Sequence, residues 1–209
     1  MTIEELNELT GGLSEPSKMP CHGYGLPAKE CATGSKLRLQ ENTTCSECYA
    51  LKGHYIWDNV QRAQYKRLDR VQNNPLWHEH MAELIDRKER SGYFRWHDSG
   101  DLQSDRHLEQ IIWIAQELKH LRFWIPSREY AIVSRVLTTH TVPKNLMIRL
   151  SAHIIDGPMP EALASRLGVG VSGVSRDKNK VTCPAPDQGN QCGDCRRCWQ
   201  KRPVTYLKH

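Results

Sequence analysis

The sequence predicts an α/β fold, either a partial parallel sheet or a partial (β/α) barrel, with a Cys-rich N-terminal loop and a C-terminal metal-binding tail. Short apolar runs alternate with helical periodicity through the middle of the chain, as in parallel sheets with helical crossovers. Each run ends in polar residues. Eight cysteines form two groups of four, one on each side of this alternating region. These features predict one domain with metal bound near both ends of the chain.

The length of 209 residues suits a single domain, 1–209. Residues 1–20 contain a Gly-Gly pair and two prolines and are expected to form a loose arm. Residues 21–48 carry four cysteines without periodicity. Such a long irregular loop is expected where metal coordination pins it. The α/β core is expected at 49–182, and the Cys-rich metal-binding tail at 183–209.

Two helices are expected before the first strand. Residues 49–70 place Tyr55, Val60 and Leu68 at roughly helical spacing, with charged residues between them. Residues 75–90 begin with Pro75, which is favoured in the first turn of a helix.

Strands and helices then alternate. The expected strands are short apolar runs at residues 93–96, 121–125, 146–150 and 169–174. The expected helices between them cover residues 104–119, 130–137 and 159–167. This order favours parallel strands joined by right-handed crossovers.

Membrane proteins are excluded by the lengths of the apolar runs, since stretches such as residues 111–115 are far too short to span a bilayer. The acidic N-terminus has no signal-peptide core. We therefore expect a cytoplasmic protein, in which reducing conditions disfavour disulfides. The net charge of +5 permits a nucleic-acid or phosphorylated partner without requiring one.

The C-terminal cysteines give the strongest signal. Cys192, Cys195 and Cys198 follow one another at two-residue gaps, and Cys183 precedes a proline. The same C-x2-C-x2-C run and Cys-Pro step occur in bacterial ferredoxins, which indicates a [4Fe-4S] cluster. Tetrahedral zinc is the alternative, although zinc ribbons usually separate their C-x2-C pairs by a longer interval.

The N-terminal cysteines are Cys21, Cys31, Cys45 and Cys48. The last two form a close pair before an expected helix, whose N-terminus favours thiolates through its dipole. The counts allow one or two clusters. Two complete four-cysteine sites are one arrangement, and three cysteines of one group with one of the other is another.

Polar residues at three consecutive strand ends form a second candidate site. The first turn supplies His97, Asp98 and Asp101, which could perform acid–base chemistry or bind a divalent metal. The following strand ends supply Arg128 and His153. In a parallel sheet these side chains face one crevice, where Arg128 could bind a carboxylate or phosphate. The alternative is that the acidic residues only form turns and cap helices.

At Cys45–Ala50, at His97–Asp101 and at the tail cysteines followed by Trp199, the chain resembles the bacteriophage gene product 88-like family. The resemblance covers most of residues 18–209. It implies a phage or prophage origin, and hence the cytoplasm of an infected or lysogenic bacterium. It implies no particular activity.

A more distant likeness is to the radical S-adenosylmethionine (SAM) enzymes. In these, three cysteines hold a [4Fe-4S] cluster whose open iron binds SAM, and a Gly-Gly-Glu strand end contacts the SAM amine. The resemblance implies that Ser99, Gly100 and Asp101 contact that cofactor here.

The same resemblance implies that Cys31, Cys45 and Cys48 are the cluster ligands. Two features depart from the pattern. The spacing is C-x13-C-x2-C in place of C-x3-C-x2-C, and Cys21 could close the open iron. The expected number of strands, four to five, is also low for such a barrel.

Three functions compete. The first is an iron–sulfur protein with a radical-SAM-like core, acting as a redox or radical enzyme on an unknown substrate. The second is a non-catalytic iron–sulfur protein that transfers electrons or senses redox state. The third is a zinc-stabilised nucleic-acid-binding protein using two basic patches. These patches comprise Arg62, Lys66, Arg67 and Arg70, and then Arg196, Arg197, Lys201 and Arg202.

Overall fold

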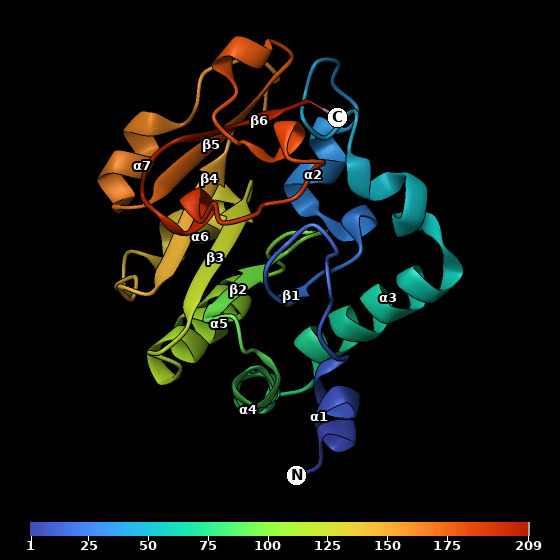
Figure 1. The fold of residues 1–209 in the computed structure, drawn as a ribbon. Helices are drawn as coiled ribbons and strands as arrows, with labels where there is room; N and C mark the ends of the chain where they lie inside the picture. The colour runs from blue at the N-terminus through green and yellow to red at the C-terminus, as the bar shows by residue number, and fades with distance from the viewer. Residues whose placement is uncertain (209) are drawn as a thin grey trace.

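The computed structural model describes residues 1–208, and these form one parallel sheet of six strands in the order β1-β2-β3-β4-β5-β6 (Figure 1). The strands are β1 Gly23–Tyr24, β2 Tyr93–Trp96, β3 Arg122–Ser127, β4 Leu146–Ser151, β5 Gly170–Ser175 and β6 Val204–Leu207. The spatial order follows the chain order, so each crossover leads to the adjacent strand. Strands β1 and β6 are the two edges of this sheet.

The same part of the chain contains seven α-helices. They are α1 Ile3–Thr10, α2 Ala32–Leu37, α3 Asp58–Asn73, α4 Trp77–Lys88, α5 Asp105–Glu117, α6 Tyr130–Val136 and α7 Glu161–Leu167. Helices α4, α5 and α6 pack in succession. None of the helices in residues 1–208 is long and apolar enough to cross a membrane.

Alternation along the strands separates two layers, because successive side chains of a strand point to opposite faces. Phe94 and Trp96 of β2 join the main core with residues of α4, α5 and α6. On the opposite face, Trp124 of β3 packs with Trp199 of the C-terminal tail and with Cys21. The tail therefore covers the sheet face that the helices leave open.

The four expected strands are confirmed as β2 to β5. The short edge strands β1 and β6 were not expected. Residues 49–57 form two short 3-10 helices, Tyr49–Leu51 and Gly53–Ile56, before α3 begins.

The expectation of a loose arm at residues 1–20 is wrong. Helix α1 begins with a capping box, in which the Thr2 hydroxyl accepts from the Glu5 N–H and the Glu5 carboxylate accepts from the Thr2 N–H. Arg67 of α3 then holds the segment after α1 by donating to the carbonyls of Gly12 and Leu13, at 2.9 and 3.0 Å. These hydrogen bonds fix the backbone around the Gly-Gly pair, which would otherwise be free to adopt many conformations.

Candidate metal centre

The cysteines meet in two groups that differ from the expected division. Cys31, Cys45 and Cys48 form the strand-end group. Burial raises the pKa of the Cys31 thiol, and the charges of Asp101, then Cys48 and Cys45, raise it further. These three thiols therefore share one neighbourhood.

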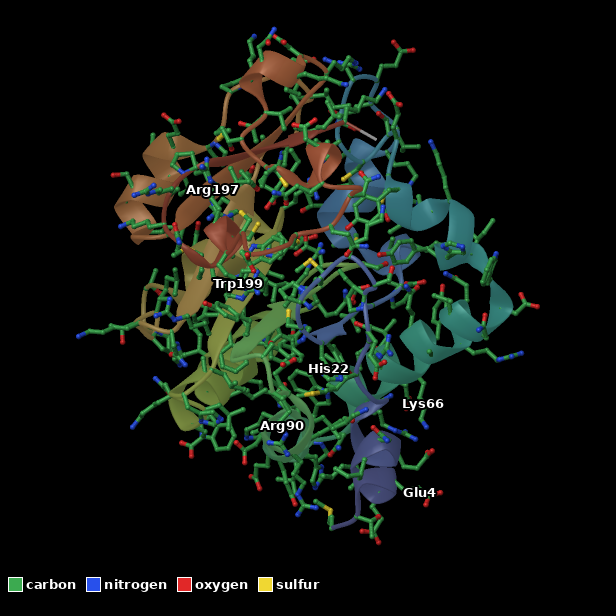
Figure 2. All side chains as sticks on the ribbon, viewed as in Figure 1. Glu4, His22, Lys66, Arg90, Arg197 and Trp199 are labelled. Atoms are coloured by element: carbon green, nitrogen blue, oxygen red, sulfur yellow. The ribbon has the colours of Figure 1, made fainter. Side chains whose placement is uncertain are left out.

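The tail group contains Cys183, Cys192, Cys195 and Cys198, with Cys21 beside them. Burial raises the pKa of Cys21 to about 12, and Glu89 and Cys192 both add to this rise. Likewise, burial and the charges of Cys183 and Cys195 raise the pKa of Cys192. Figure 2 shows sulfur atoms gathered between the C-terminal segment at Arg197 and Trp199 and the N-terminal loop near His22.

Cys21 packs with the tail and not with the other three N-terminal cysteines. This residue lies two positions before β1, the neighbour of β2. The Trp199 indole N–H donates to the carbonyl of Phe94 in β2 at 3.0 Å, which docks the tail beside the same strands. All eight cysteines, which lie within the described residues, are free thiols.

Gly34 of α2 packs closely against Cys31. A Cβ atom on Gly34 would approach the Cys31 Cβ to 2.9 Å, closer than real Cβ atoms come. The same Cβ would be in ordinary contact with the Cys45 Sγ, at 3.6 Å, and with the Cys31 Sγ, at 3.7 Å. Glycine at this position thus allows α2 and Cys31 to lie side by side. No three His, Cys, Asp or Glu side chains in residues 1–208 are grouped closely enough to hold a single metal ion.

Hydrogen bonds fix the cysteine loop over the C-terminal ends of β3 and β4. The Thr33 N–H and hydroxyl both donate to the Glu129 carboxylate, each at 2.7 Å. Arg128 Nε donates to the Thr44 hydroxyl at 2.8 Å, and the Thr44 N–H donates to the His153 carbonyl at 2.8 Å. The loop therefore sits at the sheet edge where parallel α/β proteins place their sites.

Asp101 lies beside this group, as its position after β2 predicted. Its carboxylate accepts from the Ser127 hydroxyl at 2.7 Å and from the N–H groups of Arg128 and Leu102, both at 2.8 Å. Burial nevertheless raises its pKa to about 6. A carboxyl group held this rigidly, with a pKa so close to neutral, can accept or release a proton.

The glycine of the same turn is required by its surroundings. Gly100 has a φ of +77°, and a Cβ there would lie 2.6 Å from the Leu26 Cβ. The Ser99 hydroxyl donates to the Leu26 carbonyl at 2.8 Å. This turn is thereby locked against the segment that follows β1.

His97 and Asp98 do not join the crevice. Within the described chain, neither ring nitrogen of His97 has a hydrogen-bond partner, and the ring lies 5.3 Å from that of His107 in α5. Burial holds the His97 pKa well below its usual value. Asp98 instead braces loops, since its carboxylate accepts from the Ser14 hydroxyl at 2.9 Å and its carbonyl from the Tyr49 hydroxyl at 2.7 Å.

His153 remains at the strand ends. Its ring stacks on Tyr130 with centroids 4.4 Å apart, and its Nε2 lies 3.4 Å from the Arg128 carbonyl. His153 is thus positioned next to the cysteine loop, whose Thr44 binds its backbone.

Arg149 of β4 anchors the tail group. Its side chain is fully buried, and its guanidinium donates to the carbonyls of Val171, Gln200 and Arg202. The Tyr206 hydroxyl of β6 lies 3.3 Å from the Cys198 sulfur. Sequence reasoning missed Arg149, although an arginine inside an apolar strand is itself a signal of a buried polar contact.

The first basic patch is largely engaged within the protein. Lys66 pairs with Glu8 at 2.6 Å, and Arg70 donates to the Glu8 carbonyl at 2.7 Å. Arg67 is buried against backbone carbonyls. Three of its four cations therefore hold α1 and the segment that follows it in place.

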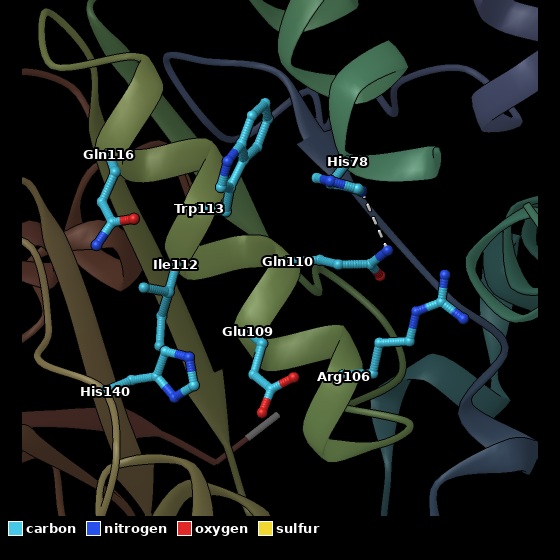
Figure 3. A pocket seen from close by; sticks show the side chains of 8 residues that line it. All are labelled: His78, Arg106, Glu109, Gln110, Ile112, Trp113, Gln116 and His140. Carbon is cyan, nitrogen blue, oxygen red and sulfur yellow. Dashed lines mark hydrogen bonds between the residues drawn. The ribbon is translucent and has the colours of Figure 1, made fainter. Parts of the chain in front are cut away.

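A surface pocket of about 280 Å³ lies on α5, apart from the cysteines (Figure 3). Figure 3 shows Gln110 pointing toward His78, with its Nε2 3.3 Å from the His78 Nδ1. Trp113 and His140 contribute to the lining. None of the predicted site residues lies in this pocket.

The sheet and the two thiol groups define a class: α/β proteins with an open parallel sheet that carries cysteines at its strand ends and over one face. The family model described as Gene product 88 matches residues 3–201, and the chain belongs to this phage family. The family resemblance of the sequence motifs is thereby confirmed. No curated protein and no solved structure matches the chain.

Proposed function

We propose that this is an iron–sulfur protein in which Cys31, Cys45 and Cys48 hold a [4Fe-4S] cluster. The observation that carries the proposal is the separation of Cys21 from these three thiols. Three thiolates leave one iron of a four-iron cluster without a protein sulfur. The donor set, all cysteine, suits such a group.

We further propose that the open iron binds SAM, with Ser99, Gly100 and Asp101 beside the ligand. The Asp101 carboxylate is adjacent to Cys31 and could accept a hydrogen bond from an amine. A reduced cluster supplies one-electron chemistry to a bound SAM. The sequential parallel order of the six strands in residues 1–208 supports this radical-SAM-like reading.

The tail group is proposed to hold a second cluster through Cys183, Cys192, Cys195 and Cys198. Four cysteines satisfy a cluster completely, so this site suits electron transfer rather than ligand binding. For the substrate we propose a phosphorylated or nucleic-acid-derived molecule. Arg128 directly follows β3, where its charge lowers the pKa of the Cys45 thiol against the larger effect of burial, and it could bind such a phosphate.

The test is anaerobic purification followed by visible absorption spectroscopy and analysis for iron, sulfide and zinc. Wild-type protein should be brown and contain roughly eight irons, as two four-iron clusters require. We compare two serine variants, one that replaces the three strand-end cysteines and one that replaces the four C-terminal cysteines. Each variant should keep about half of the wild-type iron.

SAM then separates an enzyme from an electron carrier. SAM should change the electron paramagnetic resonance spectrum of the reduced variant lacking the C-terminal cysteines, and leave the strand-end variant unchanged. No effect on either protein would favour the non-catalytic iron–sulfur function. Colourless protein containing zinc would reject both iron–sulfur functions and favour the zinc-stabilised nucleic-acid-binding one.

A further inference from the structure

We propose that Arg95 donates hydrogen bonds from its guanidinium to a cluster in the tail group and raises the reduction potential of that cluster. The proposal rests on the iron–sulfur function proposed above. It assigns a redox role to an arginine that no sequence motif marks.

Arg95 lies on the sheet face that the tail covers. Its guanidinium stacks over the Trp124 ring, with the Cζ atom 4.7 Å from the ring centroid. Trp124 packs in turn against Trp199 of the tail, with centroids 5.4 Å apart. Trp124, which is itself packed on Trp199, therefore holds the Arg95 guanidinium close to the tail.

The contacts of Arg95 leave donor capacity unused. One terminal nitrogen approaches the Tyr49 hydroxyl at 3.5 Å, and the other lies 3.7 Å from the Met19 sulfur. Both are long contacts. The buried Nε atom has no partner anywhere in residues 1–208. Because an unpaired buried donor is unfavourable, an acceptor at this position would stabilise the protein.

Met19 links the guanidinium to a tail thiol, because its sulfur lies 3.7 Å from one terminal nitrogen of Arg95 and 3.6 Å from the Cys192 Sγ. The charge of Arg95 lowers the pKa values of Cys21, Cys192 and Cys198, against the larger opposing effect of burial in each case. Other charges face the same space. Glu89 raises the pKa of Cys21 and so opposes Arg95, whereas Arg196 lowers this pKa as Arg95 does. The Arg196 Cζ atom lies 5.0 Å from the centroid of the Tyr93 ring.

A fixed cation at this position acts on the redox equilibrium. One-electron reduction adds a negative charge to a cluster that already carries four thiolates. A guanidinium that donates N–H bonds to its sulfurs stabilises the reduced form more than the oxidised form. The potential with Arg95 present should therefore be higher than without it.

Arg95 also reaches toward the strand-end group. Tyr49, whose hydroxyl contacts Arg95, follows Cys48 in the chain. The Tyr49–Arg95 contact thus joins β2 to the segment that follows Cys48.

The test uses the full-length chain with Cys31, Cys45 and Cys48 replaced by serine, so that only the tail cluster is measured. Arg95→Gln and Arg95→Lys are compared in this background by spectroelectrochemical titration after reconstitution with iron and sulfide. Arg95→Gln should shift the midpoint potential to more negative values. Arg95→Lys, which keeps the charge but loses Nε, should give a smaller shift of the same sign.

Arg122→Gln, the same change at an exposed position on β3, serves as the control and should leave the potential unchanged. Resonance Raman spectra in deuterated buffer give a second measure, since loss of Arg95 should reduce the isotope shift of the iron–sulfur bands. Wild-type potentials in loaded Arg95 variants would overturn the proposal. If Arg95→Gln does not fold, Arg95→Lys decides alone. A parent chain that binds no cluster would reject the tail cluster and the role of Arg95 with it, whereas the strand-end cluster is tested separately in the variant that lacks the C-terminal cysteines.

Discussion

Gly34 shows how close packing can require a residue without a side chain. Alanine is ordinarily better than glycine inside a helix, by roughly 0.5–1 kcal/mol. At Gly34 the added Cβ would instead come within 2.9 Å of the Cys31 Cβ, so Cys31 would have to shift. The requirement for glycine thus comes from the packing of Cys31 against α2.

We therefore expect Gly34→Ala to lower iron and sulfide at the strand-end group by at least half, while the fold is retained. Lys36→Ala, at an exposed position on the same helix, is the matched control and should keep full occupancy. Iron analysis and circular dichroism measure the two effects. Wild-type iron content in a folded Gly34→Ala protein would show that the close packing of α2 on Cys31 is not needed for iron binding.

Arg149 poses the opposite case, a large charged side chain that the fold cannot lose. Replacement by methionine keeps the stem but leaves buried carbonyls, including those of Val171 and Gln200, without their donor. The free energy of unfolding should fall by about 3 kcal/mol. Urea unfolding measures this loss, with Arg122→Met as the surface control. A change no larger than that of the control would contradict the anchoring role.

At the scale of elements, a histidine of helix α5 should make the stability of the protein depend on pH. His107 is buried, and burial lowers its pKa from 6.5 to about 3. Between these values the unfolded chain binds a proton that the folded chain excludes. Stability should therefore fall as the pH drops from about 6.5 toward 3, by at most about 1.4 kcal/mol per pH unit for this one group.

His107→Phe removes this dependence while keeping an aromatic ring against Trp77, whose centroid lies 5.3 Å away. Urea unfolding at pH 7 and pH 5 should show a smaller loss in the variant than in the wild type. Part of the dependence should remain, because burial also lowers the pKa of His97. Equal losses in both proteins would mean that His107 does not contribute.

How far the elements could be predicted depended on their length and periodicity. Strands β2 to β5 are apolar runs followed by polar turns, so the pattern identified them. β1 spans only two residues, and β6 lies among cysteines and basic residues, so neither has a pattern of its own. Helix α1 was missed although Thr2 and Glu5 have capping-box spacing, a signal that the nearby glycines obscured.

The candidate site, too, could be predicted only in part. Asp101 and Arg128 were predicted to meet because both follow strands of a parallel sheet, and they do. The position of Cys21 beside Cys192 depends on the docking of the tail by Trp199 and Arg149. No local spacing encodes that packing, so sequence reasoning could not decide between two sets of four cysteines and a division that separates Cys21 from its neighbours in the chain.

At the scale of the whole molecule, the tail forms the cover of one sheet face, so metal and fold should be coupled there. We expect Cys195→Ser to lose the tail iron and to increase amide hydrogen exchange across residues 183–203. Exchange in α5 should change little, because its core is built from other residues. Chelation of the wild type should reproduce the pattern. A stably folded Cys195→Ser protein with full iron would contradict this assignment.

The meeting of Met19 and Cys192, 173 residues apart, sets an order for biosynthesis. A ribosome needs on the order of ten seconds or more to make that stretch of chain. The strand-end cysteines have all been translated by Cys48, whereas Cys21 must wait for almost the whole protein. The tail site is therefore completed last, and a nascent chain that stalls before Cys192 leaves Cys21 as an unprotected thiol.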